Sequence, residues 1–165
     1  MRKIVIGVMG PGANPLPEDC KNAWELGKLI AQKGWVLLTG GRDEGVMDAA
    51  SKGAKSAGGL VVGILPTADT RGMSEAVDIA IATAMGSARN NINVLSSDVV
   101  IACGISAGTT SEIALALVAK KKVILLNNHP ESQVFFKKLS EENVFVAQTP
   151  LEAIAITSKL ISTGK

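Results

Sequence analysis

Three turns rich in glycine and hydroxyl residues have the composition of a phosphate-binding site. They are MGPGAN (9–14), TGGRDEG (39–45) and CGISAGTTSE (103–112). Each follows an apolar run that is predicted to be a strand, and each leads toward a predicted helix. The start of a helix offers unpaired backbone N–H groups and the positive end of the helix dipole to an anion. We therefore expect these turns to bind a phosphorylated ligand together.

The residues expected to contact the ligand lie in these turns and in the segment after the fourth predicted strand. They are Gly10, Gly12, Gly40, Gly41, Arg42, Gly45, Arg89, Asn90, Gly104, Ser106, Gly108, Thr109, Thr110 and Glu112. The glycines of the first turn do not form GxGxxG, and Thr39 and Gly40 stand where a dinucleotide-binding strand would end in an acidic residue. This pattern disfavours NAD.

The segment GTTSE (108–112) has two interpretations. In the first it is a capping box, in which the Thr109 hydroxyl accepts from the Glu112 N–H and the Glu112 carboxylate accepts from the Thr109 N–H. In the second, Thr109 and its neighbouring amides bind phosphate oxygens while Glu112 faces the rest of the ligand. Spacing alone leaves both open.

Arginines also follow predicted strands at the same edge of the sheet. Arg89 stands early in a predicted helix, where a positive charge opposes the helix dipole. It is either a solvated surface residue or a ligand for the same anion that the glycine turns bind. Arg42 and Arg71 lie on loops of that edge.

Other chemistries find little support in the residues. Gly104, Ser106 and Gly108 match the GxSxG pattern of a nucleophilic serine, but the chain has one histidine, His129, in a predicted loop after the sixth strand. The acidic residues Asp43, Glu44 and Asp48 suit the first turn of a helix, and no metal site is expected.

Composition limits the class of protein. With 165 residues the chain should form one domain over 1–165, and its core must come from aliphatic residues, because aromatics make up only 3%. A net charge of +2 without basic clusters disfavours nucleic acid as a partner. No apolar run reaches the ~20 residues of a membrane span, and two cysteines indicate no disulfide framework. We expect a soluble cytoplasmic protein that does not contact membranes.

Strand and helix patterns alternate along the chain. Strands are predicted at 3–9, 35–39, 60–65, 77–83, 98–103, 122–126 and 143–147, with helices between them, one of them over 110–120. TPLE (149–152) marks the start of a last helix, with Thr149 as its cap. This order predicts a Rossmann-like, doubly wound α/β fold with a mostly parallel sheet of about seven strands and helices on both faces.

The segments TGGRDEGVMDAASKGAKSAGGLVVGILP, MGSARNNINVLSSDVVIACG and GTTSEIALALVAKKKVILL together resemble the lysine-decarboxylase-like superfamily, which includes the LOG phosphoribohydrolases and the molybdenum cofactor carriers. The likeness covers about residues 3–127, and the short chain with its GVMDA and ARN segments is most similar to the carrier branch. The LOG signature PGGxGTxxE is matched at Gly108, Thr109 and Glu112, while Gly104–Ala107 departs from it. The Met-His-x-Arg-Lys segment is matched only by Met85 and Arg89, with Asn90 in place of Lys.

The resemblance implies a protein that binds the molybdenum cofactor, a phosphorylated pterin, and stores, protects or delivers it, with a recipient molybdoenzyme as partner. The alternative that it implies is a LOG-type enzyme that releases ribose 5-phosphate from a nucleoside 5′-monophosphate, with Arg89 and Glu112 as catalytic residues. A nucleic-acid binder like the DNA-processing protein A family shares the fold but conflicts with the low charge. Whether the chain is an enzyme stays open.

The helix predicted after residue 109 is apolar from Ile113 to Ala119. One sheet covers only one side of a helix, so the other side requires a second protein surface. We expect a homodimer, or a tetramer of such dimers, whose two-fold interface includes this helix.

Overall fold

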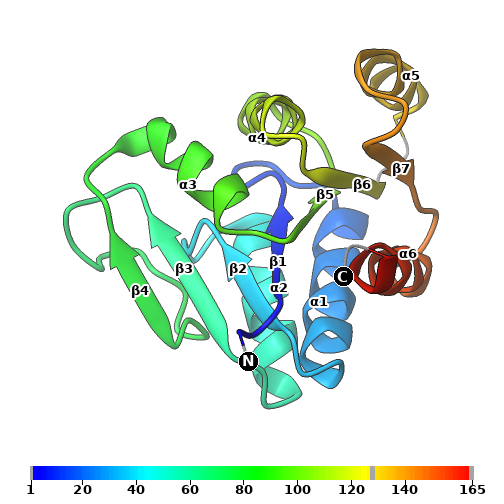
Figure 1. Ribbon diagram of the computed structural model, residues 1–165. Helices are drawn as coiled ribbons and strands as arrows, with labels where there is room; N and C mark the ends of the chain where they lie inside the picture. The colour runs from blue at the N-terminus through cyan, green and yellow to red at the C-terminus, as the bar shows by residue number, and fades with distance from the viewer. Residues whose placement is uncertain (1, 127–128, 164–165) are drawn as a thin grey trace.

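A seven-stranded parallel sheet forms the centre of the protein in the computed structural model, which describes residues 2–126 and 129–163 (Figure 1). The strand order is β4-β3-β2-β1-β5-β6-β7, and all six neighbouring pairs are parallel. The strands are β1 Val5–Met9, β2 Val36–Thr39, β3 Val61–Leu65, β4 Ile79–Ala82, β5 Val99–Cys103, β6 Lys122–Leu126 and β7 Val144–Val146.

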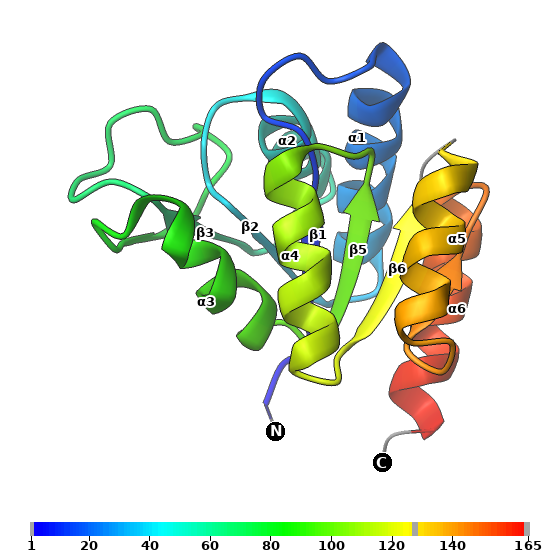
Figure 2. The same ribbon diagram turned by 90° about the horizontal axis from the view of Figure 1, so that it is seen from above.

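Helices cover both faces of the sheet (Figures 1 and 2). One face packs against α1, α2 and α6 through a core that includes Ile6, Leu26 and Ile154. The other packs against α3, α4 and α5 through a core that includes Met9, Ile113 and Phe136. The helices are α1 Pro17–Gln32, α2 Gly45–Ser56, the 3₁₀ helix η1 Gly86–Arg89, α3 Asn90–Leu95, α4 Ala107–Val118, α5 Pro130–Leu139 and α6 Pro150–Thr163.

The Rossmann-like doubly wound fold and the seven strands confirm the prediction from the sequence. The cap of the last helix is also as expected, since Thr149 Oγ1 accepts from the Glu152 N–H at 3.2 Å. The Glu152 carboxylate reaches one residue further back than a standard capping box, to the Gln148 N–H at 2.8 Å. Within the described ranges, none of the helices has the length and apolar content needed to span a lipid bilayer.

Helices α1 and α2 are in backbone contact at two glycines. A Cβ atom built on Gly27 would lie 2.0 Å from the Ala50 carbonyl oxygen, and one on Gly53 would lie 1.9 Å from the Trp24 carbonyl oxygen. Real Cβ atoms do not approach carbonyl oxygens so closely. The absence of a side chain at each glycine therefore lets the backbone of the other helix pack directly against it. This contact holds α2, which carries part of the site described below, against α1.

We predict that Gly53→Ala lowers the free energy of unfolding, although alanine is the better helix former by about 1 kcal/mol. The added methyl group forces α1 and α2 apart, and overpacking of this kind costs about 1–3 kcal/mol. Urea unfolding followed by tryptophan fluorescence measures the difference. The matched control is Gly108→Ala, another glycine within a helix, where the nearest atom to the new Cβ lies 3.8 Å away. Equal stability of the two variants would contradict the packing explanation.

Candidate functional site

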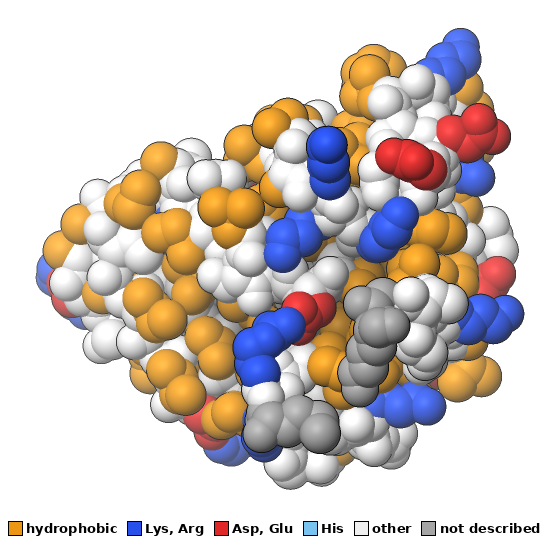
Figure 3. Space-filling model, viewed as in Figure 1, with side chains coloured by type: hydrophobic (Ala, Val, Ile, Leu, Met, Phe, Trp, Pro, Cys, Tyr) orange, Lys and Arg blue, Asp and Glu red, His pale blue; other side chains and the backbone are white. Residues whose placement is uncertain are grey.

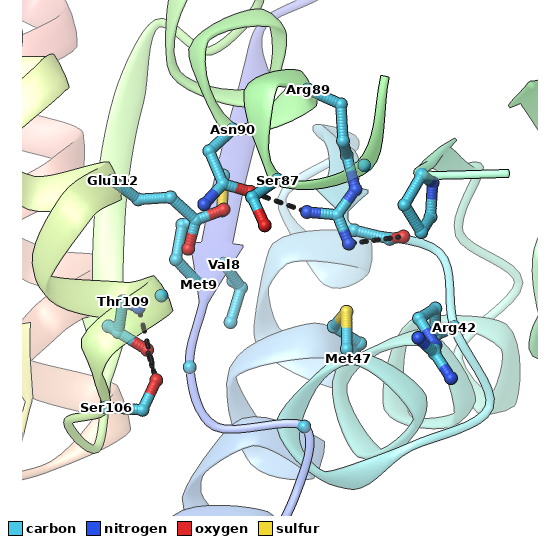
Figure 4. Close-up of a pocket in the computed structure, with 16 residues that line it drawn as sticks. Val8, Met9, Arg42, Met47, Ser87, Arg89, Asn90, Ser106, Thr109 and Glu112 are labelled. Carbon is cyan, nitrogen blue, oxygen red and sulfur yellow. Dashed lines mark hydrogen bonds between the residues drawn. The ribbon is translucent and has the colours of Figure 1, made fainter. Parts of the chain in front are cut away.

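A cavity of about 350 Å³ opens above the carboxyl ends of the strands, where the strand order reverses between β1 and β5 (Figure 4). Ligands of open parallel sheets bind at such reversal points. The lining comes from the end of β1, from the turns after β1, β2, β3 and β5, and from α2, η1, α3 and α4. It consists of Val8, Met9, Gly10, Gly12, Gly40, Arg42, Met47, Pro66, Gly86, Ser87, Arg89, Asn90, Ser106, Gly108, Thr109 and Glu112.

The structure brings together ten of the fourteen residues expected at the site. These are Gly10, Gly12, Gly40, Arg42, Arg89, Asn90, Ser106, Gly108, Thr109 and Glu112. The remaining four, Gly41, Gly45, Gly104 and Thr110, are not among the residues that line the cavity. Gly41, Gly45 and Gly104 have positive φ and shape the turns, whereas Thr110 is on the exposed side of α4.

Residues 104–107 depart from PGGx but keep a glycine at the left-handed position of the turn. The left-handed backbone conformation falls on Gly104, at φ 78°, and Ile105 has no positive φ. A side chain at position 104 would also meet the Asp19 carboxylate, 2.6 Å from its Cβ. The turn therefore keeps a glycine at the one position that requires it.

Sequence reasoning missed six lining residues, which are Val8, Met9, Met47, Pro66, Gly86 and Ser87. Met47 is the most informative of them. It lies on the first turns of α2, in the GVMDA segment, and its side chain fills the space left by Gly12 and Gly40. The sequence pattern that could have indicated Met47 is a pair of glycines, Gly12 and Gly40, in two of the expected ligand turns, with a long apolar residue soon after the second turn. Met47 gives the cavity an apolar wall between polar ends (Figure 4).

The capping-box interpretation of GTTSE is wrong. Helix α4 begins at Ala107, and its cap is Ser106, whose Oγ accepts from the Thr109 N–H at 3.1 Å. Thr109 is thus already in the first turn, and its Oγ1 lies 2.9 Å from Ser106 Oγ. Glu112 stands one turn further in, beyond the reach of the unpaired amides. Its carboxylate is free for another partner.

The start of α4 provides hydrogen-bond donors at the cavity. First-turn amides such as those of Ala107 and Gly108 have no acceptor within the helix, and Gly108 lines the cavity. The hydroxyls of Ser106 and Thr109 flank them (Figure 4). This combination suits an oxyanion, because donors and the positive end of the helix dipole point the same way.

Arg89 is a buried cation without an anionic partner. Its side chain enters the cavity from η1, and the residue is only 9% exposed. Nη1 donates to Asn90 Oδ1 at 2.6 Å and Nη2 makes a long contact of 3.5 Å with the Gly40 carbonyl, while Nε has no acceptor among the described residues. None of the described carboxylates lies within ion-pair distance of it. Burial lowers the pKa of Arg89, an effect that the charge of Glu112 partly opposes.

The position of Arg89 depends on two neighbours. A Cβ on Gly40 would lie 2.8 Å from Arg89 Nη2, so a side chain there would displace the guanidinium. Asn90, the first residue of α3, accepts from Arg89 of η1 and donates through Nδ2 to Ser111 Oγ of α4 at 2.9 Å, so it connects the guanidinium to α4. The surface interpretation of Arg89 is therefore wrong, and its place beside the glycine turns is as expected.

Glu112 is also buried, at 6% exposure, and lines the same cavity. Its Oε1 accepts from Asn93 Nδ2 of α3 at 2.8 Å. Burial raises the pKa of Glu112 to about 7, although the Asn93 hydrogen bond and the charge of Arg89 oppose the rise. Asn93, which the sequence did not single out, is fully buried behind Glu112.

The other charged and nucleophilic candidates contribute less. Arg42 lines the cavity but already pairs with Glu44 at 2.6 Å, and Arg71 pairs with Asp69 on an exposed loop. His129 is not among the residues that line this cavity. Among the residues that the structure describes, no group of three His, Cys, Asp or Glu side chains is placed to hold a metal ion. The arrangement fits recognition of an anion more closely than nucleophilic chemistry.

Solved structures of two proteins are similar to this chain over nearly its whole length. The fold is similar to that of a molybdenum cofactor binding protein from the phototrophic bacterium Rippkaea orientalis, with a TM-score of 0.96, 60% identity and coverage of 98% of this chain and 99% of that chain. It is also similar to the molybdenum cofactor carrier protein of Chlamydomonas reinhardtii, with a TM-score of 0.93, 52% identity and the same coverage.

The sequence comparisons extend the likeness to a family. An uncharacterized protein of Archaeoglobus fulgidus is 46% identical over 154 residues, which make up 93% of this chain and 94% of that protein. Residues 3–154 match the SLOG cluster4 family. The chain therefore belongs to the SLOG cluster4 family.

Proposed function

We propose that the protein binds a phosphorylated pterin, the molybdenum cofactor, and serves to store, protect or deliver it. The observation that carries this proposal is Arg89, a cation nine-tenths buried without a carboxylate partner among the described residues. Burying an uncompensated charge is costly, so a ligand that brings a negative charge to Arg89 recovers that cost on binding. The donors at the start of α4 lie on the same cavity.

The remainder of the cavity supports a ligand with an extended apolar or aromatic part. Met9 and Met47 line it between the polar groups, and thioether side chains pack well against flat rings. Proteins that bind or carry the molybdenum cofactor share 52–60% identity with this chain over 98% of its length. We propose the same ligand for this protein, with its phosphate bound by the start of α4 and by Arg89.

A LOG-type phosphoribohydrolase is the second candidate. It is favoured by one observation, the presence of Arg89 and Glu112 on the same cavity. A carboxyl group with a pKa near 7 is suited to proton transfer at neutral pH. The enzyme would use the nucleotide phosphate for binding and cleave the bond between base and ribose.

We further propose that the protein acts in the cytoplasm and passes its ligand to a recipient molybdoenzyme. Both cysteines, Cys20 and Cys103, are free thiols, which suits a reducing compartment.

Anaerobic titration of the purified protein with the molybdenum cofactor, followed by tryptophan fluorescence, tests the proposal. We expect saturable binding at one site per chain. The parallel experiment adds AMP and measures adenine by chromatography. Adenine release with catalytic turnover would replace the carrier proposal by the second candidate, and absence of cofactor binding would reject the carrier proposal outright.

We predict that Arg89→Met weakens binding of the molybdenum cofactor by about 10- to 100-fold, since hydrogen bonds to charged groups contribute about 1.5–3 kcal/mol. The same variant should leave the ligand-free protein at least as stable as the parent, because a buried charge without a counter-ion is replaced by an apolar side chain. Titration and thermal unfolding measure the two effects.

The control for this variant is Arg71→Met, which changes an exposed arginine of the loop after β3. It should alter neither affinity nor stability. A drop in stability of ligand-free Arg89→Met with unchanged affinity would mean that Arg89 is a structural residue.

We predict, as a separate proposal, a two-fold dimer or a tetramer of dimers whose interface includes α4. Large apolar side chains are exposed on β4, at the start of η1, and on α3 and α4 (Figure 3): Ile79, Ile81, Met85, Leu95 and Val118. Val118 of α4 is 82% exposed, and apolar patches of this kind mark protein interfaces.

Val118→Lys should reduce the mass found by light scattering at micromolar concentration, whereas Val134→Lys on α5 should not. A monomeric parent protein would contradict this proposal.

A further inference from the structure

Two buried groups of opposite charge face one cavity without touching each other. The charged side chains that line the cavity are Arg42, Arg89 and Glu112. Arg42 is paired with Glu44, while Arg89 and Glu112 form no ion pair with any described residue. Figure 4 shows Glu112 extending from α4 and Arg89 from η1, with Asn90 between them. A ligand in the cavity therefore meets both groups.

Asn93 determines which oxygen of Glu112 can meet that ligand. Its Nδ2 donates to Glu112 Oε1 at 2.8 Å, so the carboxyl group is held by one oxygen. Oε2 has no hydrogen-bond partner among the described residues and belongs to a side chain that lines the cavity. Asn93 is completely buried within the contact between α3 and α4, and its Oδ1 has no hydrogen-bond partner among the described residues, so the bond to Glu112 is the side-chain hydrogen bond that orients it.

Few charged groups surround Glu112, so the charge of a bound ligand can determine whether its carboxyl group is protonated. β1, β5 and α3 carry no charged residue, and Glu112 is the only charged residue of α4. β6, which also packs against α4, carries Lys122, whose Nζ donates to the Glu142 carbonyl and to Asn143 Oδ1. Among the described charged side chains, Arg89 of η1 is the one whose charge acts on the pKa of Glu112. Burial raises the pKa of Glu112 to about 7. At neutral pH the ligand-free protein is thus a mixture of the acid and the carboxylate.

An anion at Arg89 and the α4 start would shift this mixture in one direction. Glu112 lies one helical turn from Thr109, so the anion brings a like charge close to the carboxylate and also neutralises the field of Arg89. Both effects favour the neutral acid. A protonated Glu112 can then donate a hydrogen bond from Oε2, whereas an ionised one would only repel the ligand.

We propose, building on the proposed function, that Asn93 holds the carboxyl group of Glu112 by Oε1, and that in the complex Glu112 is a neutral acid that donates through Oε2 to an oxyanion of the ligand, so that binding takes up one proton from solvent. No covalent bond changes in this step. Glu112 thereby selects a ligand whose group at this position is a hydrogen-bond acceptor, such as a phosphoryl or metal-oxo oxygen, and disfavours an amino group. Asn93 is a positioning residue, because it acts on the ligand only through Glu112.

The sign of the pH dependence follows from the raised pKa of the bound state. Below about pH 7 Glu112 is already protonated in the free protein, and binding needs no further proton. Above that value the proton must be taken from solvent, so affinity falls as pH rises. For a free pKa of about 7 and a higher bound pKa, affinity should be about tenfold weaker at pH 8 than at pH 6.

The test uses sodium molybdate as a probe, since molybdate is a dianion throughout this range. Calorimetric titration at pH 8 in two buffers of different ionisation enthalpy counts the protons. We expect uptake of nearly one proton per site in the parent protein. Glu112→Gln should take up none and should bind at least as tightly as the parent at pH 8, because its neutral amide keeps the acceptor for Asn93 and the donor toward the cavity.

Two further variants separate positioning from structure. Asn93→Leu removes the hydrogen bond that favours the charged form, so the midpoint of the affinity profile should move to higher pH; a merely structural residue would lower stability without moving the midpoint. Glu44→Gln, which changes the carboxylate paired with Arg42, should retain the proton uptake.

Proton uptake that is absent in the parent, or unchanged in Glu112→Gln, would overturn the inference, and so would a cavity that does not bind molybdate. Such a result leaves the proposed function standing if the molybdenum cofactor still binds. Proton-linked molybdate binding in a protein that does not bind the cofactor would support the inference while rejecting the carrier.

Discussion

The reversal of strand order beside β1 is the constraint on which the site depends. β1 pairs with β2 on one side and with β5 on the other, and right-handed connections send the following helices to opposite faces of the sheet. The turn after β1 and the start of α4 therefore diverge above the carboxyl ends of the strands and leave room between them. Most of the remaining lining residues come from the turns after β2 and β3 and from α2, η1 and α3, so they border the same space.

The unpaired charges in this space are costly for the ligand-free protein. Arg89 and Glu112 are both more than nine-tenths buried. A direct ion pair between them would offset the cost of burying each charge. The fold keeps them apart instead, with Gly40 and Asn90 fixing the guanidinium and Asn93 fixing the carboxyl group. In a chain whose cores are almost wholly aliphatic, this local loss of stability is concentrated where a ligand can reverse it.

The fold could be predicted from the sequence because alternating apolar strands and helices with glycine turns between them admit few arrangements. Most of the site residues could be predicted as well, because the turns that follow parallel strands meet at one edge of the sheet. The prediction failed where side-chain geometry decides. The start of α4 was placed at Thr109 rather than Ser106, because both have a hydroxyl at a suitable spacing and only the backbone distinguishes them. Asn93 and Met47 were missed because their roles come from packing between distant segments.

The pairing of β1 with β5 also determines when the sheet and the cavity can form while the chain is being synthesised. Ile6 lies beside Val99 in the sheet, so the first strand made remains without one of its two neighbours until more than ninety further residues have been translated. Strands β1 to β4 can associate earlier, because their partners are close in sequence. The cavity, however, needs both the turn after β1 and the first turns of α4, and it cannot exist on a nascent chain that has not passed Glu112. A nascent chain shorter than this has no complete binding cavity for the ligand.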